Sequence, residues 1–247
     1  MSALFTYLLR LADDRLILSH RLGEWSSRAP DLEEDIALTN IGLDLLGHAR
    51  SLYQYAAEVE GAGRDEDLLA FHRDEREFFN LVLVEQPNGS FADTIARQFL
   101  FDAFQLPQWK ALMVSSNERL AGIAAKAHKE AQYHLRHSRS WLVRLGDGTD
   151  LSHDRMQKAL IRVWRYSAEL FWSDEVESSL PEVAALPETL RSEWLATVTA
   201  AIADATLAIP DTPSTLLSGR TGIHSEPLGR ILAEMQYLPR MHPEAVW

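Results

Sequence analysis

The chain has 247 residues, a hydrophobic content of 46%, no cysteine and a formal net charge of −12. The lack of cysteine excludes disulfides and thiolate chemistry. The negative charge argues against binding to nucleic acid, to an anionic membrane surface or, unaided, to a polyphosphate ligand. It would suit a basic surface on a partner protein, and it also serves simple solubility. No apolar run approaches the roughly 18 residues of a membrane span, and the first residues lack the basic region of a signal peptide, so we expect a cytoplasmic location.

Four long segments have apolar residues in alternating steps of four and three, the spacing of one helix face. The four predicted amphipathic helices run from Leu4 to Trp25, from Leu38 to Val59, from Phe91 to Met113 and from Leu120 to Leu145. Capping-box spacing predicts helix starts at three pairs: Asp31 with Glu34, Ser90 with Asp93, and Ser115 with Glu118. Gly61 is expected to end the second helix and Gly146 the fourth.

About thirty residues join the second and third helices, whereas the other two connections are tight. A shorter helical stretch is predicted within this connection, at 65–84. The pattern predicts an all-α, ferritin-like four-helix bundle with one long crossover between helices two and three. Additional C-terminal helices are predicted at 152–179, 187–208 and 225–241, with an ordered surface loop at 210–222. We expect a single domain over residues 1–247, with a core bundle at about 3–146 and a helical extension at about 150–247.

One polar residue interrupts each apolar stripe: Arg15, His48, Asp102 and His134, in chain order. Ferritin-like di-iron proteins place glutamates and two Glu-x-x-His pairs at such inward positions. Here the residue three before His48 is Leu45, and the residue three before His134 is Ala131. Neither can bind a metal, and a permanent cation at position 15 would repel iron. The sequence therefore predicts a vestigial site, and we assign no catalytic, cofactor-binding or metal-binding residue.

Two further acids, Asp44 and Glu130, each lie four residues before one of these histidines. One interpretation is a metal-free network in which Arg15 pairs with Asp102, Asp44 and Glu130 and the histidines form hydrogen bonds among them, because buried charges persist only when paired. A second is a single-metal site; its ligands would be Asp44, His48, Glu130 and His134. In a third, some of these side chains face solvent.

Several longer segments resemble one bacterial family, and together they span nearly the whole chain. They are Leu22–Trp25, Asp35–Arg50, Val84–Gln98, Lys129–Arg136 and Ala233–Leu238. The family is the C subunit of ring-1,2-phenylacetyl-CoA epoxidase, a multicomponent monooxygenase of aerobic phenylacetate degradation.

The resemblance implies a non-catalytic structural subunit that braces a homologous di-iron A subunit, which binds the acyl-CoA. A small B subunit, together with a flavin and iron–sulfur reductase, would complete the complex. Iron is then expected in the partner and no cofactor in this chain, with neither nucleic acid nor membrane as a partner. The alternatives are an autonomous ferritin-like di-iron or manganese protein and a free-standing helical interaction protein.

Overall fold

The computed structural model describes residues 2–213, 218–243 and 245. Regular structure in these residues is helical, and none of them lies in a strand. The all-α class predicted from the sequence is confirmed. The chain divides into two compact units, one formed by residues 1–87 with 217–247 and the other by residues 88–216. We call them the first and the second unit.

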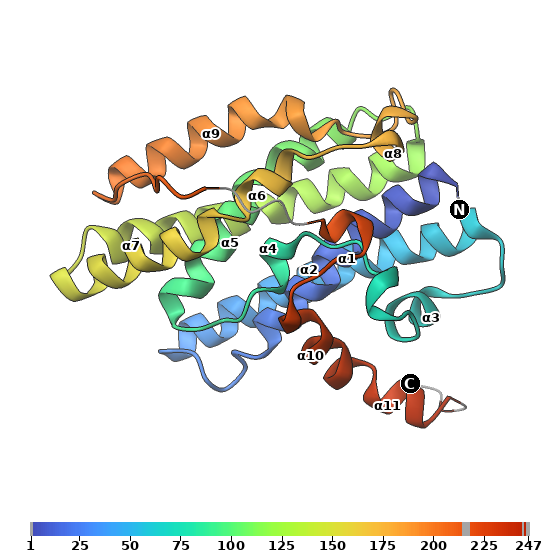
Figure 1. Ribbon diagram of the computed structural model, residues 1–247, viewed down its shortest axis with the longest axis horizontal. Coiled ribbons are helices and arrows are strands. Elements are labelled where there is room, and N and C mark those ends of the chain that lie inside the picture. The colour runs from blue at the N-terminus through green and yellow to red at the C-terminus, as the bar shows by residue number, and fades with distance from the viewer. Residues whose placement is uncertain (1, 214–217, 244, 246–247) are drawn as a thin grey trace. The chain divides into compact units, whose positions relative to one another are not determined.

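The first unit is built on a hairpin of two long antiparallel helices, α1 and α2 (Figure 1). Its elements are α1 (Ala3–Gly23), α2 (Leu32–Glu60), α3 (Glu66–Phe71), η1 (Glu75–Glu77), α4 (Val82–Glu85), η3 (Gly219–Thr221), α10 (Glu226–Met235) and α11 (Tyr237–Met241). Helix α10 packs against α1, α4 and η1, so the last part of the chain belongs to the N-terminal unit.

The second unit is built on a hairpin of α5 and α6, and α7 and α9 pack against both of these helices (Figure 1). Its elements are α5 (Phe91–Leu112), α6 (Glu118–Gly146), α7 (Asp150–Trp164), η2 (Ser167–Phe171), α8 (Glu175–Ser178) and α9 (Pro187–Asp204).

Most of the predicted helix boundaries are correct. The Asp31 carboxylate accepts a hydrogen bond of 2.9 Å from the N–H of Glu34, and Ser90 forms the predicted capping box with Asp93. Gly61 ends α2 in the left-handed conformation, with φ of 66°. The predicted start at Ser115 is wrong. Asn117 caps α6 instead, and the Ser115 hydroxyl donates to the carbonyl of Val183 at 2.9 Å.

Two stretches predicted as continuous helices are broken. Residues 65–84 form α3, η1 and the start of α4, and residues 152–179 hold most of α7 followed by η2 and α8. Inside each stretch an aspartate opens a new turn through a capping box, Asp74 with Glu77 and Asp174 with Glu177. Such residues bond to the backbone ahead of them and thereby favour a new helix start over continuation.

In each hairpin one helix is buried around its whole circumference and the other is not. In α1 every residue from Tyr7 to Ser19 is buried, and in α5 every residue from Thr94 to Gln105 is buried. The expectation that these two helices bury one stripe is therefore wrong, because a helix enclosed on all sides has no solvent face. Helices α2 and α6 follow the predicted stripe as far as Leu52 and Ser138, and beyond these residues the buried positions move by one, to Ala56 and Leu142. Polar residues anywhere around α1 and α5 are consequently buried and need partners.

Candidate functional site

The structure buries the four polar residues that interrupt the predicted stripes. Arg15, Asp102 and His134 are 0% exposed and His48 is 3% exposed. Asp44 and Glu130, the other two members of the predicted cluster, are half-buried on α2 and α6. Arg15, Asp44 and His48 belong to the first unit, whereas Asp102, Glu130 and His134 belong to the second. The salt-bridge network proposed across these six residues stays a prediction.

Arg15 has an acidic neighbour on its own helix. Its guanidinium lies 3.6 Å from the Asp14 carboxylate and donates to the carbonyl of Leu11 at 3.1 Å. Burial lowers the pKa of Arg15 to about 10, although the charge of Asp14 acts in the opposite direction. A group with this pKa remains cationic at neutral pH, so it disfavours a metal ion nearby.

In the second unit, Asp102 is held by neutral donors. The side-chain amides of Gln98 and Gln105 donate to Oδ1 at 2.8 and 2.9 Å, and the Ser138 hydroxyl donates to Oδ2 at 2.7 Å. Gln98 and Gln105 lie four before and three after Asp102, on one face of α5. Burial raises the pKa of Asp102, and the nearby His134 and the three donors offset only part of that rise.

The donor chemistry does not fit a di-iron centre. Leu45 and Ala131 are 0% exposed at the positions where Glu-x-x-His pairs would place glutamates. Across the described ranges, the structure gathers no group of three or more His, Asp or Glu side chains suited to a metal ion. The iron ions of such a centre need several anionic oxygen ligands, and the residues present do not supply them.

The first unit also contains a set of buried ion pairs that the sequence patterns did not predict. The Asp13 carboxylate pairs with the Arg73 guanidinium through two donors, one of them at 3.1 Å. It also accepts from the Tyr53 hydroxyl at 2.5 Å and from the N–H of Phe79 at 2.7 Å. This aspartate therefore joins α1 to α2 and to the irregular segment between η1 and α4.

Asp14, the next residue, binds a second arginine from the far end of the chain. Arg220 donates to its two oxygens at 3.1 and 2.9 Å, and the N–H of Leu81 donates at 2.8 Å. Burial raises the pKa of Asp14, against the charges of Arg220 and Arg15. Because Arg220 is buried, the prediction of a surface loop at 210–222 is wrong for this residue. Residues 214–217 of that predicted loop lie outside the described residues.

Glu85 forms the third buried acid of this group. It accepts from the Asn80 amide at 2.9 Å and from the N–H and hydroxyl of Ser225 at 2.7 and 2.6 Å. His224 places Nδ1 at 2.9 Å from the Glu85 carboxylate and Nε2 at 2.8 Å from the carbonyl of Phe78. Both partners are acceptors, so this geometry favours the charged imidazole, in which both ring nitrogens donate. Burial alone would lower the pKa of His224, but the bond to Glu85 and its charge outweigh burial and raise it.

Asp13, Asp14 and Glu85, which we call the acid triad, hold segments of the first unit together. Each carboxylate is paired with a cation and also accepts a backbone N–H from a segment that forms no regular helix or only the start of one. The arrangement satisfies backbone groups that would otherwise be buried without partners. One sequence signal was available: Asp13 and Asp14 stand side by side within a run of apolar residues, off the stripe of Arg15.

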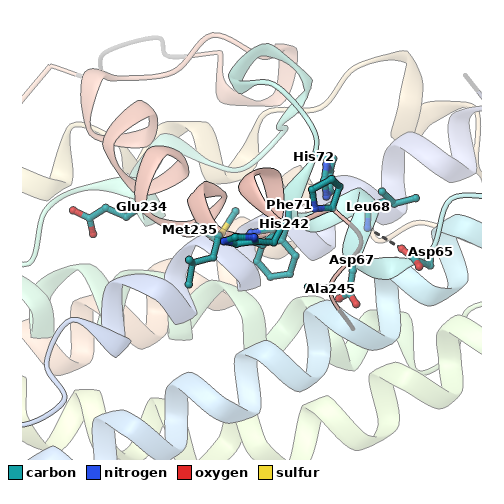
Figure 2. A pocket seen from close by; sticks show the side chains of 12 residues that line it. Asp65, Asp67, Leu68, Phe71, His72, Glu234, Met235, His242 and Ala245 are labelled. Carbon is teal, nitrogen blue, oxygen red and sulfur yellow. Dashed lines mark hydrogen bonds between the residues drawn. The ribbon is translucent and has the colours of Figure 1, made fainter. Parts of the chain in front are cut away.

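A cavity of about 410 Å³ lies in the first unit between α3 and the C-terminal helices (Figure 2). Figure 2 shows Asp65 and Asp67 on the α3 side and Glu234 with Met235 on the other. Burial and the charges of Glu66 and Asp65 raise the pKa of Asp67, which shows that negative charge accumulates here. The cavity therefore disfavours an anionic ligand such as a phosphate ester.

The length and composition of the described helices decide whether any of them could cross a membrane. None of them combines the length and the apolar composition that crossing a bilayer requires.

Comparison with known proteins gives a consistent result. The model of the family described as phenylacetic acid catabolic protein matches residues 1–247. The chain is 55% identical to the C subunit of 1,2-phenylacetyl-CoA epoxidase from Escherichia coli K12, over 100% of both chains. It is also 28% identical to the A subunit of the same organism's 1,2-phenylacetyl-CoA epoxidase, over 63% of this chain and 50% of that relative.

Proposed function

This chain belongs to the phenylacetic acid catabolic protein family, whose fold is ferritin-like and helical, and we propose that it is the non-catalytic C subunit of a cytoplasmic multicomponent monooxygenase. That enzyme epoxidises the ring of phenylacetyl-CoA in aerobic phenylacetate catabolism. The proposed role of this chain is to brace a homologous A subunit, which holds the di-iron centre. A small B subunit, together with a flavin and iron–sulfur reductase, completes the proposed complex.

One observation carries the non-catalytic part of the proposal. Leu45 and Ala131 are fully buried where a di-iron helix pair would present carboxylates, and the buried Arg15 adds a positive charge. The similarity over the full length to a C subunit, and the weaker similarity to an A subunit, support the assignment to a complex of related chains.

The acid triad supports the bracing role. A protein that fixes its partner's helices must itself be rigid, because active-site geometry tolerates displacements of only about 0.5 Å. Buried pairs that join α1 and α2 to distant segments give this rigidity. Stable hetero-complexes bury about 2,000 Å² or more, so a fixed surface matters over a wide area.

The test is co-expression with the A subunit, followed by affinity purification and metal analysis of the separated chains. We expect a stable complex in which iron follows the A subunit, whereas this chain contains none. Stoichiometric iron or manganese in this chain, with oxygen-dependent activity when the A subunit is left out, would instead establish an autonomous di-iron or manganese protein.

A further inference from the structure

Helix α2 has two apolar faces on opposite sides. The inward face carries Leu38, Ile41, Leu45 and Leu52, all 0% exposed. The outward face carries four apolar residues with large exposed fractions: Leu32 at 71%, Ile36 at 52%, Leu43 at 60% and Leu46 at 41%. With about 3.6 residues per turn, the two sets point in roughly opposite directions. Packing within the unit explains the first set and leaves the second unexplained.

The outward face has the spacing of a helix-pairing seam. Leu32, Ile36, Thr39, Leu43 and Leu46 follow one another in steps of four, three, four and three. This is the a and d pattern with which two long helices pack side by side. The fourteen steps from first to last span roughly 21 Å, at about 1.5 Å per residue. An aligned stripe of this length marks an interaction surface more strongly than single exposed residues do.

A glycine leaves room for close approach at one end of this seam. Gly47 follows Leu46 and lies one turn after Leu43, and a Cβ atom added to it would meet no atom within 4 Å. Nothing in the chain itself therefore restricts the size of this residue. A neighbouring helix could approach closely here, since small residues permit short interaxial distances.

Resting on the proposed function, we infer that this outward face of α2, Leu32 to Gly47, docks a long helix of the A subunit that has an apolar seam and basic flanks. Charge selects this occupant. Glu33 and Asp35 flank the first seam residues, at the positions that set partner choice in paired helices. Lysine or arginine on the partner would complement them.

A second copy of this chain fits the face less well. Parallel pairing would place the acidic flank of one α2 against that of the other. In antiparallel pairing the two flanks lie apart, and a second copy is then disfavoured by the net charge of −12 that each chain carries. A related but distinct chain can offer a homologous helix with different flanking charges. Pairing of such chains resembles a two-fold dimer in which equivalent surfaces meet.

The first test compares two leucines with the same exposure. Leu43 and Leu151 are both 60% exposed, but only Leu43 lies on the seam. Each is replaced by glutamate in the full chain, and the affinity for the purified A subunit is measured by titration, with the melting temperature of each free variant as a control for folding. We expect Leu43→Glu to weaken the complex at least tenfold and Leu151→Glu to change it less than twofold.

The second test adds bulk where the chain itself has space. Gly47→Trp should leave the melting temperature of the free chain unchanged or raise it, since glycine is a poor helix former. It should weaken binding of the A subunit at least tenfold. Gly122→Trp on α6 is the matched control, because Gly122 also has no atom within 4 Å of an added Cβ. This control should bind normally.

The outcomes separate the docking surface from the proposed function. If the wild-type chain binds the A subunit but both seam variants bind equally well, the docking surface is wrong and the proposed function stands. If the wild-type chain does not bind the A subunit, the proposed function fails and the docking surface fails with it. If the free chain self-associates and Leu43→Glu abolishes that association, a second copy occupies the seam and the inference is overturned.

Discussion

Four fully buried acids are held in two different ways, three of them in the first unit and one in the second. In the first unit, Asp13, Asp14 and Glu85 are each paired with a cation: Arg73, Arg220 and His224 respectively. In the second unit, Asp102 accepts hydrogen bonds from two amides and a hydroxyl. The first arrangement bonds each carboxylate directly to a cation. In the second the direct bonds come from neutral groups, and His134 acts on Asp102 only through its charge.

The difference follows from the secondary structure around each acid. The segments near Phe79, Leu81 and Ser225 have backbone N–H groups that no helix satisfies, and the acid triad accepts from all three. Asp102 lies on α5 beside α6, where the helices satisfy their own backbones. Acids that hold irregular segments are therefore expected to matter more for stability than an acid between regular helices.

The largest expected effect is the loss of a cation from the acid triad. Arg73→Met removes both guanidinium bonds to Asp13 and leaves a buried carboxylate without its counter-charge. Removing one partner of a buried pair typically costs about 3–5 kcal/mol. We expect the free energy of unfolding, measured in urea, to fall by that amount.

An exposed pair in the second unit is the control. Arg139 and Asp204 form an ion pair with side chains 42% and 56% exposed. Because water screens such pairs, Arg139→Met should cost less than about 1 kcal/mol. Equal losses in the two variants would contradict the special role given to the acid triad.

Much of the fold could be predicted from the sequence because its signals are local. Helix periodicity and caps depend on neighbouring residues, so the long helices and the starts at Asp31 and Ser90 were predicted correctly. Ser115 failed because a second capping residue, Asn117, stands two positions later and local spacing cannot choose between them. The enclosure of α1 also escaped prediction, since burial on a second face depends on segments distant in sequence.

The site was less predictable for the same reason. The burial of His48 and His134 followed from their own stripes. Arg220 is over 200 residues from Asp14 along the chain, and no local pattern links them. The composition of residues 210–222, which is rich in turn-forming residues, favoured a surface loop. Arg220 is nevertheless buried, because it pairs with Asp14.

A smaller effect concerns pH in the first unit. The folded state raises the pKa of His224 above its ordinary value of 6.5 through the bond to Glu85. Its contribution to stability is therefore fully present below about pH 6.5 and is lost as pH rises through the folded pKa. The melting temperature of the wild type should fall over this range, and the fall should be smaller in His224→Gln.

His242→Gln serves as the control, because His242 is exposed in the same unit. This variant should keep the pH dependence of the wild type. If His224→Gln also keeps it in full, another group titrates in this range and the assignment to the His224–Glu85 pair is incorrect.

The smallest expected effect is at Asp102. Asp102→Asn keeps the shape and an acceptor for the two amides, and Ser138 retains its bond to the carbonyl of His134 at 3.1 Å. Single neutral hydrogen bonds contribute about 1 kcal/mol, so the free energy of unfolding at pH 7 should fall by no more than about 1 kcal/mol.

The pH dependence of the free energy of unfolding gives a second test of the environment assigned to Asp102. Burial raises the pKa of Asp102 above 3.8, so the folded wild type binds this proton more readily than the unfolded chain. Deprotonation of Asp102 therefore lowers the stability of the wild type as pH rises from about 3.8 through the folded pKa, and Asp102→Asn lacks this contribution. In urea unfolding across this range, the free energy of unfolding of Asp102→Asn should increase relative to that of the wild type as pH rises. A loss of about 3–5 kcal/mol at pH 7 would instead indicate a cationic partner, as in the predicted pair of Arg15 with Asp102, and the contrast between the two units would then disappear.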